Sequence, residues 1–270
     1  MAAEEAAKDT PVAAAGEKPV HSISLRQWLR LAGIWLCCTL AAGLLPGQAV
    51  FASLFADAGV YGQTCKKEDV PCDSQVAMLN MMLGIGMMLS IGLQIPNGIL
   101  FDLYGGRTVG TMGSSLVVLG LLLETVAIFS AVSGTDQSTN WLVPFAAVIT
   151  DFGSMLNSYC FFSLIWHYPG STTMILSLST ATYQVSALLP LALQALMDCT
   201  GLHLGWAMLA FALCVLASIP AIWLLTPTQQ DYLDQAQEVL GIPLPKPKVS
   251  FDICDKLKKG YAAVRMDLRD

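Results

Sequence analysis

Gly98-Ile-Leu-Phe-Asp102-Leu-Tyr-Gly105-Gly-Arg107 is a short polar connection between two long apolar segments of this chain. Apolar residues lead into it from position 74 and continue after it to position 131. Gly105 permits the positive φ of a tight reversal, and Asp102 and Arg107 are spaced to pair across it. The stretch therefore predicts two helices that reverse direction at Gly105.

The rest of the chain repeats this pattern of apolar segments and tight connections. Hydrophobic residues make up 54% of the chain and charged residues only 13%, against about 25% charged in a soluble domain. A bilayer needs roughly 20 apolar residues per helix, and helices satisfy their own backbone groups in lipid. The sequence predicts an all-α membrane protein with six spans, at about 31–56, 74–101, 108–131, 141–166, 171–197 and 203–226.

Basic residues indicate which ends of the spans face the cytoplasm. Of the 14 Lys and Arg residues, all but Lys66 and Lys67 fall in segments that share one side if the N-terminus is inside. Positive charge favours the cytoplasmic side, so both termini are expected there. The distribution offers no basic patch for nucleic acid.

Three regions follow from this pattern. Residues 1–27 are Ala-rich and acidic and predict a disordered cytoplasmic tail, with neither a signal peptide nor a transit peptide. Residues 28–226 form the six-helix transmembrane domain. Residues 227–270 form a second cytoplasmic tail, in which apolar residues recur at helical spacing from Cys254 to Leu268 and predict an amphipathic helix.

The connection between the second and third segments resembles the signature of the major facilitator superfamily of transporters. Gly98, Leu100, Asp102, Gly105 and Arg107 fall on the pattern Gly-x-Leu-x-Asp-x-x-Gly-x-basic, although Leu103 and Gly106 occupy positions that are often basic. The resemblance implies that Gly98, Asp102, Gly105 and Arg107 form a gating loop. It also implies that six spans are one half of a twelve-helix transporter, built from two inverted three-helix repeats.

A narrower resemblance, from about Arg26 to Leu240, is to the large neutral amino acid facilitator branch of this superfamily. That branch includes the sodium-independent system L carriers and related fungal and apicomplexan amino acid transporters. The similar segments are Gly59-Val-Tyr61 with Thr64-Cys65, Leu79-Asn80, Pro96 to Asp102, Asp151-Phe-Gly153 and Ser177 to Gln184.

The resemblance also implies where solute would pass, because the first and fourth spans of each half line the path in this superfamily, with the fifth nearby. The candidate residues on these spans are Thr39, Gln48, Asn157, Ser158, Tyr159, Tyr183 and Gln184. Asp151 lies near mid-membrane, where a carboxylate costs about 3 kcal/mol. It either lines a cavity, with a link to protons, or joins helices. Glu124 is expected near the outer end of its span, within reach of the interface.

Other chemistry has little support in the sequence. Cys65 and Cys72 share the first outer loop and could form a disulfide, for which Cys199 could compete. The Met-rich second span is interpreted as flexible packing rather than a copper site. No catalytic, metal or cofactor motif is found, so enzyme activity is not expected.

Two functions remain open. The first is a half-transporter for amino acids or similar small neutral solutes, which works in the lipid bilayer by pairing with a second half, either another copy or a separate chain. The alternative is a former transporter half kept as a non-transporting structural subunit of a membrane complex, which the thinner charge pattern of the loop favours.

Overall fold

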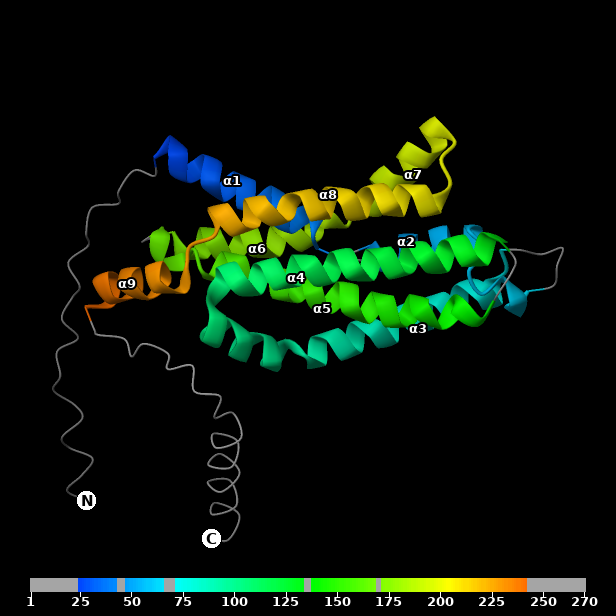
Figure 1. Ribbon diagram of the computed structural model, residues 1–270, viewed down its shortest axis with the longest axis horizontal. Coiled ribbons are helices and arrows are strands. Elements are labelled where there is room, and N and C mark those ends of the chain that lie inside the picture. Colours follow the sequence, from blue (N-terminus) through cyan, green and yellow to red (C-terminus); the bar gives the residue numbers. More distant parts are fainter. Residues whose placement is uncertain (1–23, 43–46, 66–70, 134–136, 169–170, 242–270) are drawn as a thin grey trace, which may run out of the picture.

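The computed structural model describes residues 24–42, 47–65, 71–133, 137–168 and 171–241, and the regular secondary structure of these residues is helical (Figure 1). Short 3₁₀ turns at Gly62–Thr64, Gln137–Trp141 and Ile165–His167 lie between longer helices. The longer helices are α1 (Leu25–Leu40), α2 (Gln48–Asp57), α3 (Asp73–Gly92), α4 (Gln94–Ser133), α5 (Leu142–Phe162), α6 (Thr172–Ser186), α7 (Leu189–Thr200), α8 (Leu204–Leu225) and α9 (Gln229–Leu240).

Five helical segments of the described chain are long and apolar enough to cross a bilayer. They are Asp73–Gly92, Gln94–Val132, Thr139–His167, Thr172–Thr200 and Leu204–Leu225. Large apolar side chains such as Leu119, Val126 and Leu213 are exposed on their outer faces, where lipid would cover them. The chain is therefore an all-α, multi-pass membrane protein.

The first and fifth expected spans are interrupted rather than continuous. The region expected to span 31–56 contains α1 and α2, neither of which is long enough to cross a bilayer alone. The fifth region divides into α6 and α7 at Ala187–Leu188, with Pro190 in the first turn of α7. Proline lacks a backbone N–H and favours the start of a helix, which explains that break. Pro220, by contrast, lies inside α8 without ending it.

The expected reversal lies within α4, at Gly105, which has φ 75° and ψ 165°. In Figure 1 the chain runs along α3 and the start of α4, turns back at this point, and returns beside α5. The left-handed φ favours glycine. A Cβ at this position would also lie 2.6 Å from the Cβ of Gln229 at the start of α9. Both constraints keep residue 105 a glycine.

The helical part of α4 after this turn packs against α5 with almost no side chain between the two backbones. Glycines at positions 106, 110, 113 and 120 line the contact. A Cβ on Gly113 would collide with the backbone of Asn157 and Gly153, and one on Gly153 would lie 2.6 Å from the carbonyl oxygen of Gly113. Small residues permit this approach where lipid provides no hydrophobic drive for helix association.

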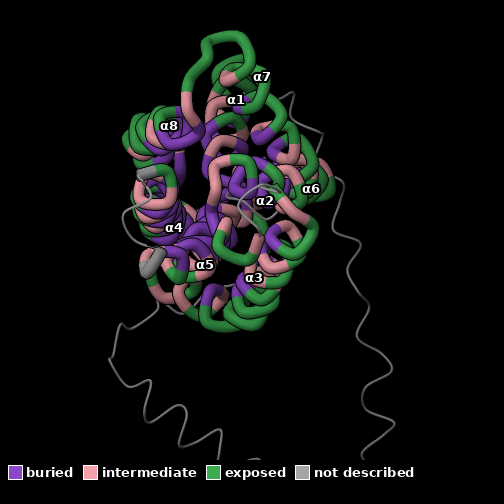
Figure 2. Tube along the Cα trace, turned by 90° about the vertical axis from the view of Figure 1, so that its right-hand side faces the viewer, coloured by how far each residue is buried: buried purple, intermediate pink, exposed green. Residues whose placement is uncertain are grey.

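The remaining helices assemble around the α4–α5 pair. Figure 2, an end view, shows buried residues gathered where α4, α5 and α8 face one another, and exposed residues on the outer sides of α3 and α7. Phe51, Phe55, Leu121, Ile128 and Met208 belong to one buried cluster that joins α2, α4 and α8. The hydrophobic core therefore lies on the side of α4 that faces α2 and α8.

Replacing Gly113 by Ala should destabilise the bundle, because the new methyl group meets backbone atoms that cannot rotate away. We expect a loss of about 1–3 kcal/mol, measured as a lower midpoint of thermal unfolding in detergent. Gly92→Ala is the matched control, because Gly92 is exposed in a helix and has nothing within 4 Å of an added Cβ. Equal midpoints for the two variants would contradict the close α4–α5 contact.

Candidate functional site

A pocket of about 370 Å³ lies between the α3–α4 junction, α5 and α6, within the range of small-molecule sites. Eight residues line it: Ile91, Gln94, Met155, Ser158, Tyr159, Phe162, Ser179 and Tyr183.

Helix α5 provides half of this lining from one face. Met155, Ser158, Tyr159 and Phe162 are spaced at i, i+3, i+4 and i+7, which places them along the same side of a helix. The Ser158 hydroxyl donates to the Met155 carbonyl at 2.6 Å, and the Tyr159 hydroxyl donates to the Gln94 carbonyl at 3.4 Å. The second contact joins α5 to the start of α4 at the edge of the pocket.

The pocket combines hydrogen-bonding groups with apolar surface, and none of the eight described residues that line it is charged. Gln94, Ser158, Ser179 and the two tyrosines provide amide and hydroxyl groups. Ile91, Met155 and Phe162 provide the apolar part. Such a lining suits a small solute without net charge, whose polar groups bind hydroxyls while an apolar portion displaces water.

The structure places the candidate path residues in different surroundings. Ser158, Tyr159 and Tyr183 line the pocket. Gln48 instead donates to the Asn80 carbonyl at 3.2 Å, and Thr39 donates to the Trp35 carbonyl of its own helix at 2.8 Å. Gln184 is exposed and Asp151 is buried, and neither lines the pocket. These residues therefore do not share one surface.

Asn157 joins helices rather than lining the pocket. It is buried on the α4-facing side of α5, and its Oδ1 accepts a hydrogen bond from Ser114 of α4 at 3.0 Å. The Cys38 and Cys160 thiols lie 3.9 Å from the same oxygen. Its amide therefore connects α1, α4 and α5.

Glu124 departs from its expected position near the interface, because it is fully buried between α4 and α5. The Thr150 hydroxyl of α5 donates to Glu124 Oε1 at 3.2 Å. The close approach of the two helices encloses this side chain and prevents it from reaching water.

The residues of the expected gating loop contact the chain near α9 instead of each other. Arg107 Nε donates to the Thr226 carbonyl at 2.8 Å, and its guanidinium lies 5.7 Å from the centre of the Trp223 ring. Asp102 accepts a hydrogen bond from Gln229 through its backbone carbonyl. The expected pairing of Asp102 with Arg107 is therefore wrong in this structure, because the turn at Gly105 directs Arg107 toward the end of α8.

Two arginines meet the C-terminus of α8. Arg30 of α1 donates to the Leu225 carbonyl at 2.5 Å, beside the Arg107 contact with Thr226. The last carbonyls of a helix have no partner within it and carry partial negative charge. Arg30 and Arg107 therefore satisfy these groups and hold α1, α4 and α8 together at one end.

Aromatic contacts continue from this end to the pocket. Tyr232 of α9 meets Phe101 edge-on at 5.8 Å between ring centres. Phe101 in turn lies 5.5 Å from Tyr159 and 6.5 Å from Phe162. Since Tyr159 and Phe162 line the pocket, α9 is linked to its wall through one intervening ring. Gly98 is close as well, since a Cβ there would lie 3.8 Å from the Tyr159 hydroxyl.

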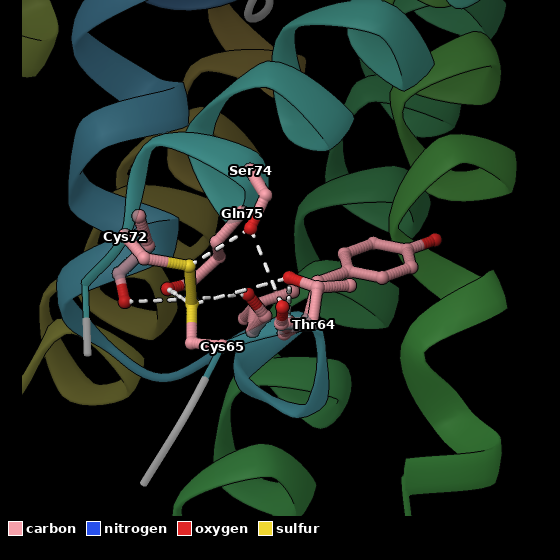
Figure 3. Close-up of a disulfide and its surroundings, with 8 residues drawn as sticks. Thr64, Cys65, Cys72, Ser74 and Gln75 are labelled. Carbon is pink, nitrogen blue, oxygen red and sulfur yellow. Dashed lines mark hydrogen bonds between the residues drawn. A yellow bond between two sulfur atoms is a disulfide. The ribbon is translucent and has the colours of Figure 1, made fainter. Parts of the chain in front are cut away.

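A disulfide joins Cys65 and Cys72 at the opposite end of the bundle (Figure 3). The Ser74 hydroxyl donates to the Thr64 carbonyl at 3.3 Å. The buried Gln75 amide donates to the carbonyls of Ala56 and Val60 at 3.0 and 2.7 Å. These bonds fix the start of α3 against the end of α2. Cys199 is a free, exposed thiol.

Sequence reasoning missed five lining residues: Ile91, Gln94, Met155, Phe162 and Ser179. Met155 and Phe162 could have been found from helical spacing, because they extend the face of α5 that holds Ser158 and Tyr159. Gln94 and Ile91 lie where α3 ends at Gly92 and α4 begins at Gln94, a break that Gly92 and Pro96 mark in the sequence. The tail helix from Cys254 to Leu268 lies outside the described residues.

Comparison with known proteins supports a relationship to amino acid transporters. No family model matches the chain, and no solved structure matches it significantly. It is 23% identical over 172 residues to the human large neutral amino acids transporter small subunit 3. The aligned region covers 57% of this chain and 30% of that protein. The chain is 30% identical over 89 residues to Protein FMP42 of Saccharomyces cerevisiae. That alignment covers 32% of this chain and 17% of that protein. The chain thus spans less than a third of either relative, and it is transporter-like in sequence and composition.

The start of α9 should become less stable in acid. Thr228 caps α9, and hydrogen bonds from its side chain and backbone, with the nearby Arg107, hold the pKa of Asp231 below its ordinary value. A lowered pKa stabilises the folded state above the ordinary carboxyl pKa, and that contribution is lost as pH falls through the lowered value. Hydrogen-exchange protection of α9 should therefore decrease below that range.

Asp231→Asn should remove this pH dependence and cost about 0.3–1 kcal/mol at neutral pH, read as lower protection of α9. Asp234→Asn, which changes the same charge at an exposed position three residues later, is the control. If the two variants lower the protection of α9 equally, the cap at Thr228 is not the cause of the pH dependence.

Proposed function

We propose that this chain is a transporter half of the major facilitator type, which moves amino acids or similar small neutral solutes across a membrane. The observation that carries the proposal is the pocket between α5 and α6. Its described lining residues provide hydroxyl, amide and apolar groups, and none of them is charged. The similarity to a human protein named as a large neutral amino acids transporter subunit supports the same solute class.

The order of the helices is compatible with six membrane crossings. The apolar helix Gln94–Val132 turns back at Gly105, so the part before the turn completes the α3 crossing and the part after it makes the next. If α1 and α2 together make one crossing, and α6 and α7 another, then α5 and α8 bring the number to six. The six would form two inverted three-helix repeats.

Alternating access would require a second half against the pocket. The pocket is walled by α5, α6 and the α3–α4 junction. Transporters of this kind hold the solute between two repeats that move against each other. We propose that the opposite wall comes from a second half, either another copy of this chain or a separate polypeptide.

We propose that the end of the bundle that holds α9 faces the cytoplasm. The start of α1, the turn at Gly105 and α9 lie at the same end of the bundle (Figure 1), where Arg30 and Arg107 contact α8. The disulfide lies at the other end, which suits an oxidising compartment. Gly98, Asp102, Gly105 and Arg107 would then form the cytoplasmic gate, with α9 bound against it.

Filling the pocket should block transport. Ser158→Leu adds apolar bulk at a lining position and removes a hydroxyl, so uptake of radiolabelled Leu, Phe or Met into proteoliposomes should fall at least tenfold. Ser115→Leu is the matched control. Ser115, like Ser158, donates to a carbonyl of its own helix, here the one four residues earlier at 2.8 Å, but it is exposed on α4 and does not line the pocket.

Uptake should be measured with and without a co-expressed second half of a related transporter. Uptake by the wild type and the Ser115→Leu protein, with loss in Ser158→Leu, would support a solute path at this pocket. Absence of uptake under both conditions, from protein that is folded and inserted, would overturn the transporter proposal and favour a structural subunit.

A further inference from the structure

Asn97, near the start of α4, carries a fully buried amide whose hydrogen-bonding groups are unpaired. Its side chain is 0% exposed, and neither Nδ2 nor Oδ1 bonds to a partner among the described residues. A buried amide that leaves its donors and its acceptor unpaired destabilises the folded state. The position therefore carries a polar group that the described part of the chain does not use.

The other buried asparagines of the described residues are paired. Asn157 Oδ1 accepts from the Ser114 hydroxyl at 3.0 Å, and Asn140 Nδ2 donates to Gln63 Oε1 at 2.8 Å. Polar side chains inside membrane bundles ordinarily join helices in this way. Asn97 differs from both, so the joining of helices does not explain its amide.

Asn97 lies on the face of α4 that meets the pocket. Gln94, three residues before it, lines the pocket. Phe101, four residues after it, lies 5.5 and 6.5 Å between ring centres from the lining residues Tyr159 and Phe162. Residues three and four apart share one face of a helix. Asn97 is therefore flanked, one turn before and one turn after, by residues that form or contact the pocket wall.

The contacts that hold Gln94 against α5 are weak enough for a solute to replace. Gln94 Nε2 donates to the Met155 thioether at 3.4 Å, and the Gln94 carbonyl accepts from the Tyr159 hydroxyl at the same distance. Sulfur is a weak acceptor, and 3.4 Å exceeds the usual length of an O–H···O bond. A solute with better hydrogen-bonding groups can displace these contacts and reach the amide of Asn97 in the same turn.

The break between α3 and α4 supplies a second acceptor beside the pocket. In a continuous helix the Gly92 carbonyl would accept from the backbone N–H of residue 96, but Pro96 has no N–H. Gly92 is exposed and directly follows Ile91, which lines the pocket. Its carbonyl lacks the usual helical partner and can accept from a donor on the solute.

These groups match the polar end of an α-amino acid. An α-amino acid carries an ammonium group, which donates, and a carboxylate, which accepts. The Asn97 amide offers both complements on one rigid group, Nδ2 for the carboxylate and Oδ1 for the ammonium. The Gly92 carbonyl can accept from the ammonium as well. The two charges of such a solute cancel, which suits a pocket whose described lining residues are all uncharged.

We propose that Asn97 binds the ammonium and carboxylate groups of a zwitterionic α-amino acid, whose apolar side chain lies against Ile91, Met155 and Phe162. This assignment rests on the transporter function proposed above and names the group that recognises its solute. A bound amino acid pairs the buried amide, so part of the binding free energy comes from satisfying Asn97.

Binding is measured without transport, as the rise that a ligand causes in the midpoint of thermal unfolding in detergent. Asn97→Leu should raise the midpoint of the ligand-free protein, because an apolar side chain replaces an unpaired buried amide. The variant should need roughly tenfold more leucine than wild type for an equal shift. Asn80→Leu makes the same change at an exposed position of α3 and should leave the response to leucine unchanged. A wild-type response in Asn97→Leu would overturn the proposal.

Analogues of leucine test the same contacts in the unaltered protein. 4-Methylpentanoate lacks the ammonium group and 3-methylbutylamine lacks the carboxylate, so each should require roughly tenfold more ligand than leucine for an equal shift. Equal shifts for leucine and both analogues would overturn the assignment, even if no variant of Asn97 folds.

Asn97→Asp should reverse the preference. Aspartate keeps the acceptor, loses the amide donors and adds a negative charge, so the variant should bind 3-methylbutylamine better than leucine. A variant that folds and still prefers leucine would contradict the pairing of the amide with the solute carboxylate.

The pattern of results separates this inference from the proposed function. Binding and uptake of leucine that are equal in wild type and Asn97→Leu would disprove the role of Asn97 alone. A folded wild type that neither binds nor takes up leucine, phenylalanine or methionine would disprove the transporter proposal and this site with it.

Discussion

The close contact between α4 and α5 is the constraint on which the rest of the structure depends. At Gly113 and Gly153 the two backbones approach so closely that neither position can accept a methyl group. This contact fixes the direction of α5, and with it the face that carries Met155, Ser158, Tyr159 and Phe162 toward α6. It also encloses Glu124 and Thr150. The pocket and the buried acid are thus two results of one helix pair.

The two ends of the bundle are held in different ways. At one end polar contacts over long sequence distances join Arg30, Arg107 and Gln229 to backbone carbonyls. At the other, a disulfide and the Gln75 amide fix a local loop. Hydrogen bonds to carbonyls can be exchanged for others at modest cost, whereas a covalent bond cannot. In the transporter proposed above, the end held by exchangeable hydrogen bonds would be the end that opens and closes.

The sequence predicted an all-α membrane protein and the reversal at Gly105 because both depend on local properties, the length of apolar runs and the φ freedom of one glycine, although the first and fifth expected spans are each divided into two helices. It did not predict which glycines pack, since Gly106, Gly110, Gly113 and Gly120 differ from other glycines only in what faces them. Tertiary contacts also explain why Asp102 and Arg107 do not pair. Their spacing favours an ion pair, but the turn at Gly105 directs Arg107 to the end of α8. Ser158, Tyr159 and Tyr183 were proposed by resemblance, and the structure brings these three together but leaves Gln48, Asn157 and Gln184 elsewhere.

The double arginine contact at the end of α8 has a consequence for how the protein is made. Arg30 and Arg107 lie 195 and 119 residues before the carbonyls that they bind. During synthesis both side chains leave the ribosome long before their partners exist, so the early helices enter the bilayer with this end unfinished. The end of α8 is therefore needed to complete this end of the bundle, and a nascent chain stopped before Leu225 would leave both arginines without these carbonyl partners.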